Sequence, residues 1–251
     1  MTNYTIKTPE EIKKLQAGGK ILAKIVKALG KAAKPGMTTL ELDTLARKLM
    51  ADYKVQPSFL EFGDPPYPAV LCTSINEGIV HCIPNETVLK EGDIIGIDCG
   101  IWHENLCTDM AITVGIGKVS AEAKKLMEVT EKSLNLAIKQ IKPGNTLGDI
   151  GYAVQSYAES FGYGVVRQLV GHGVGYEVHE EPRIPNYGIK GKGLVLEPGM
   201  VIAVEPMITA GSYDIEVSFN GWDIVTKDKS LAAHFEHTIV VTKKGCEVLT
   251  K

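Results

Sequence analysis

LKEGDIIGID, residues 89–98, returns later in the chain as LEPGMVIAVE, residues 196–205. In both stretches a turn precedes an apolar run that ends on a carboxylate, so Asp98 aligns with Glu205. Self-similarity at a long period indicates a duplicated structural unit. The sequence therefore predicts two similar halves related by an approximate two-fold axis.

Further stretches of the two halves align in the same order. VHCIP aligns with VHEEP, which pairs His81 with His179, and DMAITV aligns with EHTIVV, which pairs Asp109 with Glu236. Chance would rarely match carboxylates with carboxylates and an imidazole with an imidazole in a single sequence. We predict a single domain, residues 1–251, with halves of about 8–118 and 119–251.

Each half is expected to run helix, helix, strands. TPEE at residues 8–11 supplies a cap, a first-turn proline and acids for a helix start, and TTLE at residues 38–41 has capping-box spacing. The apolar period changes to two in DIIGIDCGIW and NLCTDMAITV, which predicts two strands joined by a short turn. Helices return from Ser120, and short strands fill roughly the last 80 residues. This order indicates an α+β fold.

The composition is that of an ordinary globular protein. Hydrophobic residues make up 44% and charged residues 23% of the 251 residues, and the net charge is -3, so nothing favours binding to DNA. No apolar run approaches the roughly 18 residues of a membrane span, and the first residues lack the apolar core of a leader. The five cysteines form no C-x-x-C pair, which favours free thiols in the cytoplasm.

Asp109 lies within a predicted strand, where a carboxylate needs an explanation. An aspartate on an edge strand facing water is the simplest alternative. However, a turn near Glu104 would place Asp98 directly opposite Asp109, unless a bulge shifts the register. The duplicated couple, Glu205 and Glu236, would lie in the other half, and the two-fold axis would bring the four acids together.

Four carboxylates in one cleft need cations, because two unit charges 4 Å apart repel by about 4 kcal/mol at an effective dielectric near 20. Two divalent ions carry four positive charges and would balance the set. His172, in GHGVG, aligns with Ser74, so the first half has no equivalent imidazole. This asymmetry is consistent with one ion having an extra ligand.

SINEGIVHCIP, IDCGIW, TDMAIT, GHGVGYEVHEEP, VIAVEPM and FEHTIVV together closely resemble type I methionine aminopeptidase, across nearly the whole chain. The resemblance implies the pita-bread fold, in which two αβ halves with a curved antiparallel sheet and outer helices enclose a two-metal site. It also implies five metal ligands, with Asp109 and Glu236 shared by both ions: Asp98, Asp109, His172, Glu205 and Glu236.

The resemblance further implies substrate contacts. They are two histidines at the scissile bond and three walls of a pocket for the methionine side chain: His81, His179, Tyr67, Cys72 and Trp222. The loop FLEFGDPPYP is about two residues longer than is usual, which leaves the role of Phe62 open, and Val178 stands where a bulkier residue is common.

The implied activity is removal of the amino-terminal methionine from nascent proteins and peptides, with a preference for a small second residue. Two bound ions would lower the pKa of a shared water, giving a bridging hydroxide, and would polarise the scissile carbonyl. Glu205 would carry the proton to the leaving amine, His179 would donate to the carbonyl oxygen and His81 would assist at the amide nitrogen. Oxygen and imidazole ligands suit Mn, Fe(II), Co or Zn.

The expected partners are nascent chains, with a possible transient ribosome contact, and the protein is expected to be a monomer. Two alternatives stay open from the sequence. One is a proline-directed relative such as prolidase or aminopeptidase P, which usually adds a large N-terminal domain for which this chain has no room. The other is a binding protein that has lost its metal site, although here no ligand position is missing.

Overall fold

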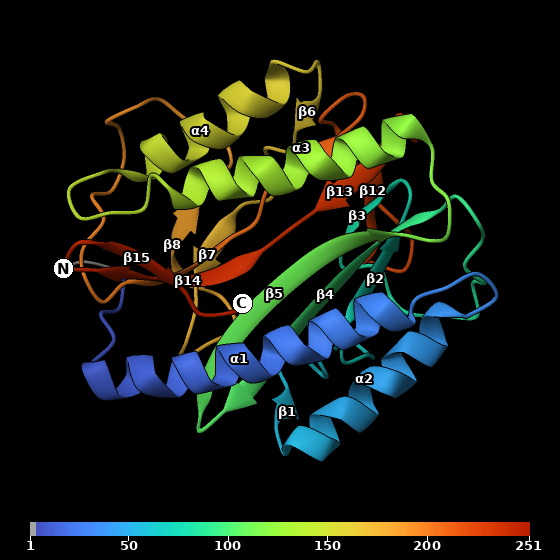
Figure 1. The fold of residues 1–251 in the computed structure, drawn as a ribbon, viewed down its shortest axis with the longest axis horizontal. Coiled ribbons are helices and arrows are strands. Elements are labelled where there is room, and N and C mark those ends of the chain that lie inside the picture. Colours follow the sequence, from blue (N-terminus) through green and yellow to red (C-terminus); the bar gives the residue numbers. More distant parts are fainter. Residues whose placement is uncertain (1–3) are drawn as a thin grey trace.

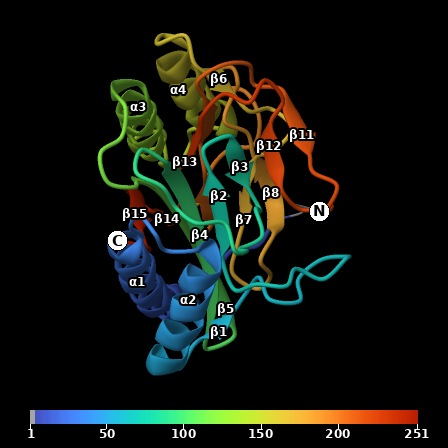
Figure 2. The same cartoon turned by 90° about the vertical axis from the view of Figure 1, so that its right-hand side faces the viewer.

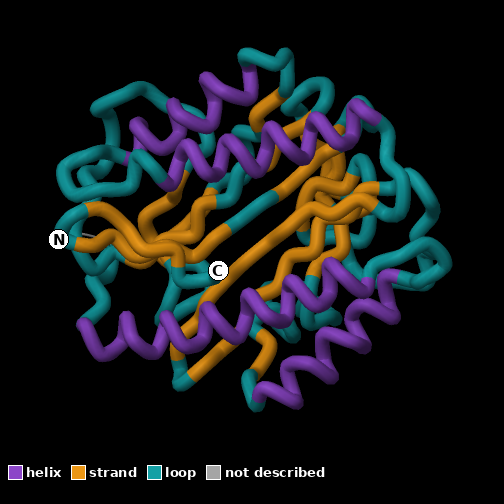
Figure 3. The backbone as a smooth tube through the Cα atoms, viewed as in Figure 1, coloured by secondary structure: helices purple, strands orange, loops and turns teal. Residues whose placement is uncertain are grey.

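Two pairs of helices flank the strands in the computed structural model, which describes residues 4–251 (Figure 1). The first pair is α1 (Pro9–Ala32) and α2 (Thr39–Tyr53), and the second is α3 (Ala121–Ile138) and α4 (Leu147–Glu159). Figure 3 shows these helices along both margins, with the strands running between them. The α+β class and the order helix, helix, strands in each half are confirmed.

Both helices of the first pair begin with a capping box, which the sequence predicted for α2; for α1 it predicted the cap, the first-turn proline and the acids. The backbone N–H of Thr8 donates to the Glu11 carboxylate at 2.7 Å, and the Glu11 N–H donates to the Thr8 hydroxyl at 3.3 Å. Thr38 and Glu41 repeat the exchange at 2.7 and 3.1 Å. Each exchange satisfies backbone donors that a helix start leaves free.

The strands of the first half centre on a long hairpin. They are β1 (Gln56–Pro57), β2 (Cys72–Ile75), β3 (Gly78–Val80), β4 (Ile94–His103) and β5 (Leu106–Gly115). Strand β4 pairs antiparallel with β1, β2 and β5. The hairpin turn consists of Glu104 and Asn105, whose φ angles of 48° and 63° are those of a type I′ turn.

The predicted direct pairing of Asp98 with Asp109 is wrong. Asp98 lies opposite Ala111, and Asp109 lies opposite Gly100, because the two-residue turn is centred between Glu104 and Asn105. Ala111 and Asp109 are two residues apart, so both carboxylates still project from the same face of the hairpin. The two acids are therefore diagonal neighbours.

The second half has shorter strands and a five-stranded antiparallel sheet in the order β15, β14, β9, β7, β8. Its strands are β6 (Gly164–Val165), β7 (Gly171–Gly173), β8 (Glu180–Ile184), β9 (Val201–Val204), β10 (Met207–Thr209), β11 (Ile215–Val217), β12 (Ile224–Thr226), β13 (Ala232–His234), β14 (His237–Thr242) and β15 (Gly245–Val248). His237 pairs with Val204. Glu236 precedes His237 and Glu205 follows Val204, so the two acids lie one residue beyond that pair, side by side as predicted for the second couple.

Matched turns support the internal repeat. Gly36 donates its N–H to the Leu89 carbonyl at 2.9 Å, and Gly144 donates to the Leu196 carbonyl at 3.2 Å. The two glycines have φ angles of 89° and 86°, which disfavour any residue with a Cβ. The bounds of the halves, and their membership of one domain, stay a prediction.

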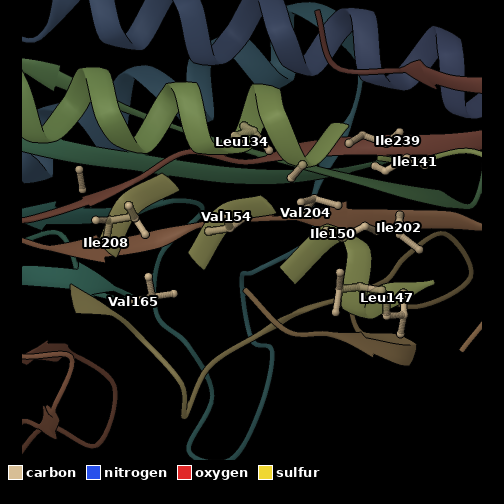
Figure 4. Close-up of a cluster of buried hydrophobic side chains, with 14 of the residues drawn as sticks. Leu134, Ile141, Leu147, Ile150, Val154, Val165, Ile202, Val204, Ile208 and Ile239 are labelled. Atoms are coloured by element: carbon tan, nitrogen blue, oxygen red, sulfur yellow. The ribbon is translucent and has the colours of Figure 1, made fainter. Parts of the chain in front are cut away.

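Each half has its own apolar core beneath its helices. Leu22 and Val26 of α1 pack with Ile97 of β4 in the first. Figure 4 shows the second, where side chains of α3 and α4 meet those of β9, among them Leu134, Ile150, Val154, Ile202 and Val204. In Figure 2 the helices gather on one side of the strands, and β8, β11 and β12 lie on the other. The helices therefore cover one side of the strands, and loops and strand ends form the other side.

The two halves meet where β5 and β14 lie side by side near the centre of Figure 1. Glu236 donates its N–H to the carbonyl of Ala111 at 2.9 Å, and Asp109 donates its N–H to the hydroxyl of Thr238 at 2.8 Å. This seam places an acid of each half next to the other. Among residues 4–251, none of the helices is both long and apolar enough to cross a membrane.

Candidate active site

A cavity of about 50 Å³ lies at the seam, and all ten site residues predicted from the sequence line it. They are Tyr67, Cys72, His81, Asp98, Asp109, His172, His179, Glu205, Trp222 and Glu236. Every one of them comes from a strand or a loop. The cavity opens into a larger cleft of about 700 Å³, and four residues line both: His81, His172, His179 and Glu205.

Four acids line the cavity. Asp98 projects from β4 and Asp109 from β5, while Glu205 follows β9 and Glu236 precedes β14. Asp98, Asp109 and Glu236 are only 8%, 3% and 2% exposed. Like charges so close together, and so far from water, strongly disfavour the ionised state.

Burial accordingly raises the pKa of each acid. The pKa of Asp109 rises to about 7 and that of Glu205 to about 8. Burial and the neighbouring carboxylates lift the pKa values of Asp98 and Glu236 well above the ordinary range. A cation bound among the four acids would reverse these shifts, because it favours the ionised form.

Two carboxylate oxygens of this group are buried and unpaired within the described chain: Oδ1 of Asp98 and Oε1 of Glu236. An unpaired buried carboxylate is costly unless it coordinates a metal or meets a charge. Ligand atoms of Asp109, His172 and Glu236 lie within 4.8 Å of one another. The residues therefore fit a divalent ion, and they form a carboxylate–histidine cluster compatible with one.

His172, in β7, is oriented as metal-binding histidines usually are. Its Nδ1 lies 2.9 Å from the carbonyl oxygen of Gly173, so Nδ1 donates and Nε2 keeps its lone pair. Nε2 lies 3.5 Å from Oε1 of Glu205. Burial, helped by the nearby His179, lowers the pKa of His172 to about 3, which keeps the imidazole neutral.

His81 and His179 stand at the opening between the cavity and the larger cleft. His81 follows β3 with a φ of 60°, and His179 immediately precedes β8. The rings of His179 and His172 meet edge to face, with centroids 4.5 Å apart. Burial lowers the pKa of both His81 and His179, that of His81 to about 4, so both are neutral at pH 7.

The end of the cavity away from the cleft is aromatic. Tyr67 and Trp222 pack edge to face at 5.1 Å, and Cys72 lies opposite Asp98 in the β2–β4 pair. Phe59 and Phe62 also line the cavity. The sequence left the role of Phe62 open and did not single out Phe59, although both belong to the quoted loop FLEFGDPPYP.

His234 was missed from the sequence. It ends β13, is 2% exposed, and its Nε2 lies 3.4 Å from Oε2 of Glu205. Extended backbone places residues two apart on the same face. The position of His234 two residues before Glu236 could therefore have indicated it.

Comparisons with known proteins agree on one family. The profile of metallopeptidase family M24 matches residues 13–243. A methionine aminopeptidase from Clostridium acetobutylicum is 47% identical over 246 residues, which are 98% of each chain. The crystal structure of methionine aminopeptidase from Thermotoga maritima superposes with a TM-score of 0.96 at 43% identity, covering 99% of each chain. Such agreement confirms the predicted pita-bread fold.

A prolidase from Pyrococcus furiosus is a more distant likeness. It is 25% identical with a TM-score of 0.80, and the match covers 98% of this chain but 65% of the prolidase. The remainder of the prolidase lies outside the match.

Proposed function

Because the chain belongs to metallopeptidase family M24, we propose that it is a metal-dependent aminopeptidase that removes the amino-terminal methionine from nascent proteins and peptides. The relatives named methionine aminopeptidase match it over nearly their whole length. The observation that carries the proposal is the convergence of all ten predicted residues on one cavity. A non-catalytic binding protein would have no need of four acids buried together.

The cavity and the cleft suggest where a peptide lies. The small inner cavity is closed by Tyr67, Cys72 and Trp222 and would hold one side chain, that of the first residue. The larger cleft would hold the rest of the peptide. His81, His179 and Glu205 line both spaces, so the scissile bond would lie beside them. A cavity that holds one side chain would limit cleavage to the first residue.

Two divalent ions would be held by the five predicted ligands, Asp98, Asp109, His172, Glu205 and Glu236. When bound, they would lower the pKa of a water and polarise the scissile carbonyl. Mn, Fe(II), Co and Zn all accept oxygen and imidazole ligands. We propose two ions because two divalent cations would balance the four negative charges of the acids.

The chain's own residues would then move and stabilise protons and charge. Glu205, which lines both the cavity and the cleft, would take a proton from the attacking water and pass it to the leaving amine. Neutral His179 would donate a hydrogen bond to the carbonyl oxygen as it gains charge. His81 would contact the amide nitrogen of the scissile bond. The preference for a small second residue follows from the resemblance to type I methionine aminopeptidase.

A peptide assay tests the proposal. Metal-free protein with Mn or Co added should release methionine from Met-Ala peptides and, to a lesser extent, Met-Pro peptides, and should leave X-Pro dipeptides intact. Cleavage of X-Pro dipeptides would favour the proline-directed alternative. No release of any residue with either metal would favour the binding protein.

His81→Ala tests the histidine roles. This variant should keep its bound metal, because His81 is not a proposed ligand, and should lose about 100-fold or more in kcat, in the range for a positioned proton-transfer group. His103→Ala is the control, because His103 is a partly exposed histidine at the end of β4 that lines neither the cavity nor the cleft, and this variant should match the parent protein. Full turnover by His81→Ala would contradict the assignment.

The cellular setting is also a proposal. All five cysteines are free thiols, and four are buried, which supports a reducing cytoplasm. A cytoplasmic enzyme would meet nascent chains as they emerge. The monomeric state and the transient ribosome contact stay predictions.

A further inference from the structure

The carboxylate of Glu205 lies between two imidazoles. Nε2 of His172 is 3.5 Å from Oε1, and Nε2 of His234 is 3.4 Å from Oε2. The two histidines differ in placement. His172 lines the cavity, whereas His234 is not among the residues that line it. His234 therefore contacts Glu205 from outside the set of residues that line the cavity.

The side chain of Thr113 anchors the main chain of His234. The hydroxyl of Thr113 donates to the carbonyl oxygen of His234 at 2.7 Å and accepts its N–H at 2.9 Å. Thr113 belongs to β5, the strand that carries Asp109. His234 also pairs with Met207, two residues beyond Glu205. Its position is thus set by the same strands that set the acids.

The backbone of Glu205 is fixed as well. Asn186, which is fully buried, donates from its side-chain nitrogen to the Glu205 carbonyl oxygen at 2.9 Å. These contacts anchor both backbones, so the orientation of the Glu205 carboxylate depends on its side-chain torsions. A contact on Oε2 would limit those torsions.

Nε2 of His234 is buried and has no hydrogen-bond partner among the described residues. Leaving such a nitrogen unpaired costs about 1–3 kcal/mol. A carboxylate can only accept, so the imidazole nitrogen that faces it must carry the proton. Closing the 3.4 Å contact to a hydrogen bond, about 2.7–3.2 Å, needs a shift of only a few tenths of an ångström.

We propose that His234 is a positioning residue whose Nε2–H donates to Oε2 of Glu205 and fixes the carboxylate with Oε1 toward His172 and the cavity. This inference rests on the proposed function, in which Glu205 is both a metal ligand and the proton carrier. Hydrogen bonds that orient a ligand in this way commonly change metal affinity or activity by about 10–100-fold.

Two substitutions separate positioning from packing. His234→Leu keeps the apolar bulk and removes the donor, whereas His234→Gln keeps a side-chain N–H at similar reach. We expect His234→Leu to lose about 10-fold or more in kcat on a Met-Ala peptide with KM within about 2-fold of the parent value, and His234→Gln to recover most of that loss. His103→Leu, at the partly exposed end of β4 and outside the cavity and the cleft, should behave as the parent protein.

Calorimetric titration of the metal-free variants with Mn gives a readout independent of turnover. His234→Leu should bind the same number of ions as the parent, about 10-fold or more weakly, and His234→Gln should restore the affinity. If His234→Leu does not fold, His234→Asn, whose amide is too short to reach Oε2, replaces it with the same expectations.

Three results would overturn the inference. They are a parent-like kcat and Mn affinity in His234→Leu, a failure of His234→Gln to recover either, and the loss of one ion per chain, which would make His234 a ligand. Failure of the proposed function would look different, because the parent protein itself would then release no methionine while the Mn titration could still be compared between variants.

Discussion

The side chain of Thr238 closes a ring with the main chain of Asp109: its hydroxyl accepts the Asp109 N–H at 2.8 Å and donates to the Asp109 carbonyl at 2.8 Å. Thr238 is fully buried on β14, in the second half, and Asp109 is on β5, in the first. One hydroxyl thus joins the halves at the position of a proposed shared metal ligand.

Thr238→Val should destabilise the protein strongly. The valine has the same shape but leaves the N–H and the carbonyl of Asp109 buried without this partner, at about 1–3 kcal/mol each. We expect the free energy of unfolding in urea to fall by about 2–4 kcal/mol. Thr242→Val, at the partly exposed end of the same strand, is the control and should stay within about 0.5 kcal/mol of the parent. Equal stability of the two variants would show that the bridge contributes little.

Asp98→Asn and Glu236→Gln should each reduce bound metal and abolish activity while the protein stays folded. The amides remove the charge that the buried oxygens offer to a cation. The loss in kcat/KM should exceed the roughly 100-fold that is typical when only a supporting hydrogen bond is removed. Elemental analysis and the peptide assay give the two readouts, and Glu128→Gln, exposed on α3, is the control. Full turnover with either amide would count against the metal site.

The metal-free protein should lose stability between pH 7 and pH 8. The folded-state pKa values of Asp109 and Glu205 are about 7 and about 8, whereas unfolded carboxyls titrate near pH 4. A raised pKa means that the folded state binds more protons, so the contribution is present at low pH and is lost as pH rises through 7 and 8. The buried histidines, whose pKa values are lowered, have completed their opposite contribution above about pH 6.5.

Thermal unfolding at pH 7 and pH 8 measures this effect, and each kcal/mol lost should lower the Tm by about 2–4 °C. Excess Mn should remove the fall, because bound cations favour the ionised acids. A Tm that is the same at both pH values without metal would mean that the acids titrate normally and lie closer to water.

Gly63→Ala should weaken binding of the methionine side chain. Gly63 has a φ of 82°, and a Cβ built there would lie 2.6 Å from the ring of Trp222, which must then move. Gly36→Ala is the matched control, since Gly36 has a φ of 89° with open space around it. Both variants should lose about 1 kcal/mol of stability, but only Gly63→Ala should raise KM for Met-Ala peptides. Equal KM values would exclude Trp222 as a wall of the pocket.

The sequence predicted which face each acid occupies better than it predicted the acid's neighbour. A change in the turn centre shifts the partner of Asp98 by two residues, from Asp109 to Ala111, and leaves the face unchanged. Alternation therefore placed both acids in the cavity, whereas their register depended on the conformation of Glu104 and Asn105, which periodicity does not encode.

Other residues were beyond the reach of pattern alone. Phe59 lies in an irregular loop, where no period links sequence position to burial, and its place in the cavity depends on long-range packing. The place of His234 two residues before Glu236 could have drawn attention to it, but its contact with Glu205 follows from the β10–β13 pairing, which joins residues far apart in sequence. The aligned histidines and acids were accessible because the repeat supplied a second copy for comparison.

The seam between β5 and β14 also bears on the origin of the chain. Asp98 and Asp109 belong to one half, and Glu205 and Glu236 belong to the other, so neither half alone has more than two of the four acids. An ancestor of half this length could have assembled four acids only as a symmetric pair of identical subunits. Fusion into one polypeptide would then have freed each copy to diverge, so that His172 arose opposite a serine.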